Sequence, residues 1–206
     1  MAHPSFDYAA LSTLNLWLMT DSHVHHALQG PSQSGKLDAI ARAAPRFGYS
    51  HELNTKHDAG RGLLRFQPAL DVIDKLDAES FAEDTVKSMR DVSDQLSSQY
   101  GNENVFSATT KLLWLKFRYP IIIYDERIAT VLGTRLTRDY YDQWQARFKY
   151  HEQSVADACL SLVDALTYVC DPDVATKEFV AKVSTSTWFQ HRAFGSYLTF
   201  MGRNAV

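Results

Sequence analysis

Most of this chain carries apolar residues at the three- and four-residue spacing of an α-helix, and this pattern limits what it can fold into. The helical segments that the spacing predicts are residues 6–19, 37–44, 68–76, 79–98, 108–117, 126–132, 138–169, 174–182 and 185–201. Only residues 120–124 have a strand-like composition, and they are too short and too isolated to form a sheet. The pattern therefore predicts an all-α fold.

We expect residues 1–206 to form a single compact helical domain of two packed lobes with a cleft between them. The N-terminal and C-terminal helices would contribute to one lobe. The 138–169 segment is long enough that a break near Tyr150 is expected, and Pro68 suits a first helical turn. Side chains that suit helix N-caps are Ser34, Asp77, Ser107, Asp125, Thr137 and Asp173. Residues 45–67 lack periodicity and form a loop long enough to suggest a functional role.

The composition is that of a soluble globular protein, with 45% apolar and 22% charged residues. No apolar run approaches the 18 or more residues that a membrane span needs. The first ten residues lack the basic flank and apolar stretch of a secretory signal. Cys159 and Cys170 are expected to be reduced core residues. These features predict a cytoplasmic protein without a membrane partner.

The formal net charge of −3 argues against an indiscriminate nucleic-acid binder, but the charges are unevenly distributed. Residues 68–103 contain nine acidic against three basic residues, whereas residues 111–149 contain eight basic against four acidic residues. The second stretch could bind a polyanion on one face. Solvated helix surfaces of unlike charge would give the same pattern.

Residues 105–133 combine features that stability alone does not require. An apolar helix carrying Lys111 leads to Pro120, then to three consecutive isoleucines, and then to Asp125 at the start of another helix. The dipole of that helix would keep the carboxylate ionised. Asp125 is therefore the first candidate for a catalytic carboxylate, and an ordinary N-cap aspartate is the alternative.

This region resembles the helix-hairpin-helix DNA glycosylase superfamily, the endonuclease III and 8-oxoguanine glycosylase group. Residues 85–98 match its first helix, 99–107 its hairpin and 108–117 its second helix, so 85–133 would be the catalytic unit. The stretch from Ser107 to Lys111 lies where the family has its Gly-x-Gly-x-Lys turn, and the spacing from Pro120 to Asp125 matches that from the family's proline to its catalytic aspartate. The glycine pair of the hairpin is absent, and Lys111 precedes Asp125 by fourteen positions, about one helical turn fewer than usual in the family.

The resemblance implies a DNA N-glycosylase that flips a base and cleaves its glycosidic bond. Asp125 would be the catalytic carboxylate, and Lys111 would be the nucleophile if the enzyme also nicks the abasic strand as a lyase. Substrate contacts are expected from Trp114, Tyr124, Arg127, Arg135, Arg138, Ser107 and Thr109. No metal or organic cofactor is implied, and two cysteines are too few for an iron–sulfur cluster.

Two further hypotheses concern biological role. The compact, glycine-poor form is similar to bacterial anti-phage glycosylases that remove modified phage bases, so the target would be single- or double-stranded, modified DNA and the protein a monomer. The alternative is a non-catalytic helical module that binds nucleic acid or a protein, with Asp125 only capping a helix.

The Asp21-Ser22-His23-Val24-His25-His26 string is a second motif with metal-binding chemistry. It lacks the strand context of amidohydrolase-like barrels, and on a helix His23 and His26 would share a face while His25 points away. A zinc site with His51 and His57, and with it a metal-dependent hydrolase, is the third interpretation. Residues 30–36 superficially resemble a phosphate-binding loop, but Leu37 follows the lysine where the motif needs Ser or Thr.

Overall fold

A computed structural model describes residues 5–53, 62–102, 105–134, 137–171 and 173–203. In these residues the predicted all-α class is confirmed, because helices and turns account for the ordered backbone and no strand is formed. Residues 120–124, which have a strand-like composition, belong to no helix or strand. None of the described helices is long and apolar enough to cross a membrane.

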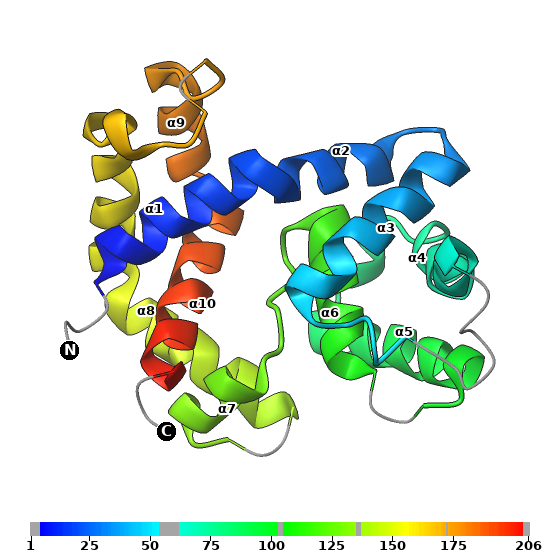
Figure 1. Ribbon diagram of the computed structural model, residues 1–206. Coiled ribbons are helices and arrows are strands. Elements are labelled where there is room, and N and C mark those ends of the chain that lie inside the picture. Colours follow the sequence, from blue (N-terminus) through cyan, green and yellow to red (C-terminus); the bar gives the residue numbers. More distant parts are fainter. Residues whose placement is uncertain (1–4, 54–61, 103–104, 135–136, 172, 204–206) are drawn as a thin grey trace. The chain divides into compact units, whose positions relative to one another are not determined.

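The chain divides into two compact units, which Figure 1 shows in sequence colours. Unit 1 comprises Met1–Thr20 and Tyr124–Val206, and unit 2 comprises Asp21–Ile123. The first and last helices thus belong to the same unit, as the sequence predicts. The boundary between the units falls near residues 20–21 and again near residues 123–124.

Unit 1 is built around α10 (Thr187–Arg203), which contacts the other α-helices of the unit. These helices are α1 (Phe6–Leu16), α7 (Glu126–Leu132), α8 (Thr137–Leu160) and α9 (Lys177–Ser184), with short 3-10 turns at Ser161–Asp164 and Leu166–Tyr168. Phe189, Phe194 and Trp144 are almost completely buried between them. Aromatic side chains of this size bury large apolar areas and contribute strongly to the core of the unit.

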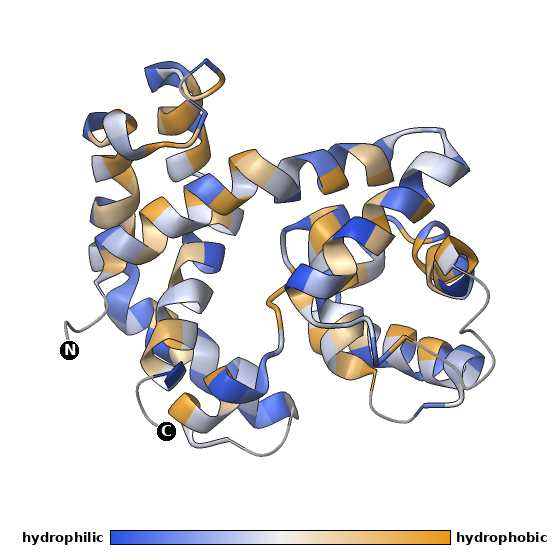
Figure 2. Cartoon of the chain, viewed as in Figure 1, coloured by the Kyte–Doolittle hydropathy of each residue, from blue (hydrophilic) through white to orange (hydrophobic). Residues whose placement is uncertain are grey.

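Unit 2 is built around α6 (Phe106–Phe117), which packs against α2, α3 and α5. The helices of the unit are α2 (Ser22–Gln29), α3 (Gln33–Phe47), α4 (Gln67–Ile73), α5 (Thr85–Tyr100) and α6, with 3-10 turns at Gly62–Phe66 and Glu79–Phe81. Figure 2 shows hydrophobic residues along much of α6, as its central position requires. Leu112, Leu113 and Leu115 are each at most 1% exposed.

Several helix boundaries differ from the prediction. Ser32 rather than Ser34 caps α3, Thr176 rather than Asp173 caps α9, and Ser107 lies inside the first turn of α6. The predicted helix 79–98 is a 3-10 turn followed by α5, because Asp84 accepts the backbone N–H of Lys87 and starts a new helix. The predicted break at Tyr150 is wrong, since α8 continues through it.

The N-terminal helical stretch is longer than predicted. After α1 the backbone forms one π-helical segment, Trp17–Asp21, and then continues as α2. Cys159 is buried as expected, but the expectation for Cys170 is wrong because its side chain is exposed; both cysteines are free thiols.

Candidate active site around Asp125

Asp125 is the N-cap of α7, as predicted. Ile121 and Ile122 are buried just before it, and the backbone at Asp125 is extended (φ −143°, ψ 130°) before the helix starts at Glu126. The carboxylate oxygen Oδ1 accepts the backbone N–H of Arg127 at 2.8 Å. Within the described part of the chain, Oδ2 makes no hydrogen bond. The hydrogen bond to Oδ1 therefore fixes the orientation of the carboxylate, and Oδ2 is available to a substrate.

Tyr140 of α8 packs against Tyr124, the residue before Asp125. It is completely buried. Burial raises the pKa of Tyr140, and the negative charge of Asp125 raises it further. The phenol therefore keeps its proton at any physiological pH.

Tyr124 and Arg127 flank Asp125 along the chain. The ring of Tyr124 is partly exposed and lies 4.8 Å from the ring of Tyr140, centroid to centroid. Burial raises the pKa of Tyr124, and the charges of Glu126 and Asp125 add to the effect. Arg127 is exposed on the first turn of α7. A carboxylate, an aromatic face and a guanidinium thus follow one another within four residues of unit 1.

The position of α7 is fixed by a close approach of α10. A Cβ atom added at Gly202 would lie 3.1 Å from the carbonyl oxygen of Arg127 and 3.3 Å from Val131 Cγ2. The backbone of α10 therefore touches α7 near its first turn, which is possible because residue 202 has no side chain.

Lys111 lies in unit 2, where its ammonium group has a hydroxyl and a carboxylate as neighbours. Its Nζ donates to Ser107 Oγ at 2.7 Å and lies 4.0 Å from Glu52 Oε1. The second oxygen of Glu52 accepts the backbone N–H of Ala108 at 2.8 Å, so this carboxylate caps the N-terminus of α6. Since Lys111 and Asp125 belong to different units, their convergence on one cleft stays a prediction.

Two of the predicted substrate contacts are wrong. Trp114 is only 2% exposed and packs near Phe47, because α6 is the central helix of unit 2 and is apolar on most of its surface. Thr109 is completely buried and donates its hydroxyl to the carbonyl of Val105. Neither side chain can touch DNA in this structure. Ser107 is half-buried and accepts a hydrogen bond from Lys111.

The basic residues of 111–149 are divided between the two units. Lys111, Lys116 and Arg118 belong to unit 2 and are buried or half-buried, whereas Arg127 and Arg138 are exposed in unit 1. Arg138 lies 3.9 Å from Asp142, one turn along α8. Arg135 lies outside the described residues. Arg127, in the first turn of α7 beside Asp125, and Arg138 of α8 are thus exposed cations of unit 1.

The histidine string forms part of α2 and has no metal-site geometry. His23 and His26 are exposed, whereas His25 is buried with Nδ1 at 2.9 Å from the carbonyl oxygen of Leu115, so the predicted division between helix faces is correct. Burial lowers the pKa of His25. Asp21 forms an ion pair with Arg46 instead of facing the histidines. No group of three potential metal ligands occurs in the described ranges, and His57 lies outside them.

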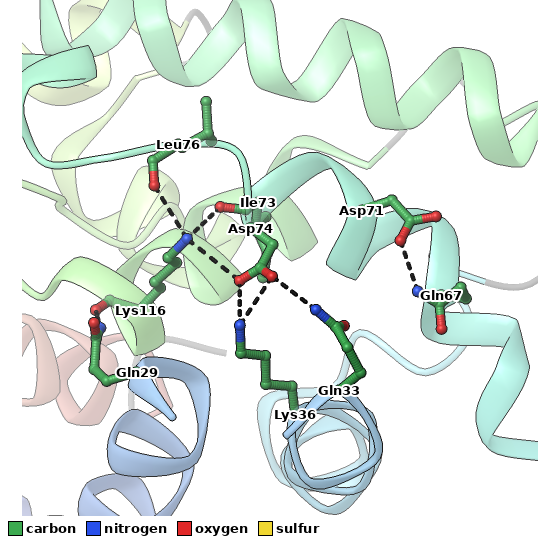
Figure 3. A network of polar contacts seen from close by, with 9 residues as sticks. All are labelled: Gln29, Gln33, Lys36, Gln67, Asp71, Ile73, Asp74, Leu76 and Lys116. Carbon is green, nitrogen blue, oxygen red and sulfur yellow. Dashed lines mark hydrogen bonds and ion pairs between the residues drawn. The ribbon is translucent and has the colours of Figure 1, made fainter. Parts of the chain in front are cut away.

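Unit 2 contains a partly buried polar cluster that the sequence does not predict. Asp74 accepts from Lys36 Nζ at 2.6 and 2.9 Å and from Gln33 at 3.0 Å, and lies 3.8 Å from Lys116 Nζ (Figure 3). Lys116 also donates to the carbonyls of Ile73 at 2.5 Å and Leu76 at 3.1 Å. The one available signal was a lysine inside the otherwise apolar run 112–117. Lys36, Asp74 and Lys116 thus link α3, the end of α4 and α6. We interpret their role as structural.

Comparisons with protein-family models, curated proteins and solved structures found no match to this chain.

Proposed function

We propose that the protein is a DNA N-glycosylase in which Asp125 is the catalytic carboxylate. The observation that carries the proposal is the way Asp125 is held: it caps α7, with Oδ1 accepting the backbone N–H of Arg127, shortly after the buried residues Ile121 and Ile122. A carboxylate at a helix start, beside a partly exposed tyrosine and an exposed arginine, suits a reaction that builds positive charge on a sugar.

In the proposed reaction the bond between C1′ of the deoxyribose and the base nitrogen breaks, and its electron pair leaves with the base. The Asp125 carboxylate stabilises the positive charge that develops on the sugar and orients the attacking water. The water oxygen bonds to C1′, and in the net reaction the base nitrogen gains the proton that the water loses.

A base in a duplex must be extruded before this reaction, at a cost of a few kcal/mol. We propose that Tyr124 stacks on the extruded base or its neighbour, since aromatic stacking is worth about 1–3 kcal/mol per base. Arg127 and Arg138 would contact phosphates. Modified phage bases are the substrate class that we would test first, beside ordinary lesions.

We assign the nucleophile to water rather than to Lys111. The amine must lose its proton before it attacks carbon, and the Lys111 side chain donates to Ser107 and lies beside the carboxylate of Glu52. The alternative form of the proposal adds a lyase step. In that step Lys111 forms a Schiff base with the aldehyde of the abasic sugar and releases water.

The test is abasic-site formation on DNA with normal, damaged and phage-type modified bases, comparing wild type with Asp125→Asn. Asparagine caps helices about as well as aspartate, so the variant should fold normally and lose only the charge. We expect the excision rate to fall at least about 100-fold. Asp139→Asn changes an exposed carboxylate on α8 and should leave the rate unchanged.

The second candidate is a non-catalytic DNA- or protein-binding module, which is favoured by the capping bond that already engages the Asp125 carboxylate. It predicts DNA binding without abasic sites from wild type on any substrate. Equal excision by wild type and Asp125→Asn would contradict the role of Asp125 while leaving a glycosylase possible.

A further inference from the structure

Gly202 of α10 makes room for the backbone of α7. Gly202 is buried, and a Cβ atom at this position would lie 3.1 Å from the carbonyl oxygen of Arg127, 3.3 Å from Arg127 Cβ and 3.3 Å from Val131 Cγ2. A side chain there would require these atoms to move by a few tenths of an ångström. Glycine is a poor helix former, so its presence inside α10 is explained by this close approach rather than by helix stability.

Two of these three atoms belong to the residue that orients the Asp125 carboxylate. The backbone N–H of Arg127 donates to Asp125 Oδ1 at 2.8 Å, and the same Arg127 is the residue that Gly202 approaches. Helix α7 has only seven residues and buries Ile128 and Leu132, so it packs as one short piece. A shift of its first turn therefore moves the N-cap residue Asp125 with it.

We propose that Gly202 is a positioning residue of the active site: the close approach of α10 to Arg127 sets where the Asp125 carboxylate meets the sugar. This inference rests on the proposed glycosylase function. Displacing a reacting group by about 1 Å can cost on the order of 100-fold in rate. A shift of a few tenths of an ångström, as Gly202→Ala requires, should therefore cost about 4-fold, and the larger side chain of Gly202→Val at least about 10-fold.

The experiment compares wild type, Gly202→Ala, Gly202→Val and Gly195→Ala in the full chain. Gly195 is the matched control, because it lies on the same helix and a Cβ atom there would meet nothing within 4 Å. Gly202→Val is also combined with Asp125→Asn. Single-turnover excision and affinity are measured on a duplex carrying the base that wild type excises, at a temperature where every variant is folded. Hydrogen exchange of the Arg127 amide is measured without DNA.

We expect the graded loss of rate at Gly202 with DNA affinity unchanged and with faster exchange of the Arg127 amide. Gly195→Ala should excise at the wild-type rate. Because Gly202 acts through the carboxylate, Gly202→Val should lower the rate no further in the Asp125→Asn background. If Gly202→Val does not fold, Gly202→Ala replaces it in this comparison.

Two results would overturn the inference. One is an unchanged excision rate in the Gly202 variants. The other is the same fold-loss with and without the Asp125 carboxylate, which would indicate a purely structural effect. Absence of excision by wild type would overturn the proposed function and the positioning role together, and the exchange of the Arg127 amide would show separately whether Gly202 fixes that residue.

Discussion

Lys111 illustrates, at the scale of a single residue, how neighbours decide between a nucleophile and an ion pair. Lys111 and Glu52 have side chains only 11% and 14% exposed, so each desolvated charge depends on the other. The carboxylate also caps α6 through Ala108. The Lys111–Glu52 pair therefore contributes to the stability of unit 2 whether or not Lys111 also takes part in a reaction.

We predict that Lys111→Met lowers the free energy of unfolding by about 1–2 kcal/mol, because it leaves the Glu52 carboxylate without its cation. Excision should persist in the variant, since the proposed nucleophile is water. Lys149→Met is the matched control: Lys149 pairs with Glu152 at 2.5 Å, but the side chains are 79% and 47% exposed, so a change below about 0.5 kcal/mol is expected. Denaturant unfolding measures the stability of both variants.

Borohydride trapping on abasic DNA measures the chemistry of the same residue. The proposal predicts no covalent complex with wild type. A trapped complex that disappears in Lys111→Met would instead make Lys111 a Schiff-base nucleophile and restore the lyase variant.

The contact between α7 and α10 is the element-scale feature on which the position of Asp125 depends. A Cβ atom at Gly202 of α10 would lie only 3.1 Å from the carbonyl oxygen of Arg127, whereas a Cβ atom at Gly195 of the same helix would meet nothing within 4 Å. The two glycines therefore provide a matched pair for the same substitution.

We predict opposite effects of alanine at the two positions. Gly195→Ala should stabilise unit 1 by roughly 0.5–1 kcal/mol through helix propensity alone. At Gly202 the same gain is offset by overpacking, which typically costs 1–3 kcal/mol, so Gly202→Ala should be destabilising by up to about 2 kcal/mol. Thermal unfolding measures both. If both alanine variants were stabilised equally, α7 would be free to move away from α10. The position of Asp125 would then not be fixed by this contact.

The helical elements also show what the periodicity could and could not predict. Residues 22–29 are not among the predicted helical segments, yet they form α2, in which Val24, His25 and Leu28 are buried. The expected break in α8 did not occur because the apolar positions continue past Tyr150, from Phe148 to the buried Val155. A histidine or an exposed tyrosine interrupts a pattern of hydrophobicity without interrupting a helix.

At the scale of the whole molecule, local patterns predicted the fold class, the shared unit of the terminal helices and the N-cap role of Asp125. Long-range partners could not be predicted in the same way. The cap of α6 comes from Glu52, 56 positions before Ala108, and Asp74 meets Lys36 across 38 positions. Nothing in the local sequence of either partner specifies the other. Burial inside a unit has the same long-range origin, and for this reason the sequence predicts DNA contacts for Trp114 and Thr109, which are core residues.

The Asp74 cluster makes a prediction for unit 2 as a whole, because it joins three of its helices. Asp74→Asn leaves the mostly buried ammonium groups of Lys36 and Lys116 without their shared carboxylate, and we expect a loss of about 2 kcal/mol in unfolding free energy at neutral pH. Asp71→Asn is the control on the same helix, since Asp71 is exposed and accepts only from Gln67 among the described residues, and its effect should stay within about 0.5 kcal/mol.

The pH dependence of that loss tests its electrostatic origin. The hydrogen bonds from Lys36 lower the pKa of Asp74 most. Burial opposes them, and the hydrogen bond from Gln33 and the charges of Lys36 and Lys116 add to the lowering. A carboxylate whose folded pKa is lowered contributes stability that is present above its unfolded value of about 3.9 and is lost as the pH falls through the folded value. The difference between wild type and Asp74→Asn should therefore be constant from about pH 7 to pH 5 and shrink below about pH 4. Urea unfolding over this range measures it, and a difference that persists unchanged into acid would mean that Asp74 contributes through packing rather than charge.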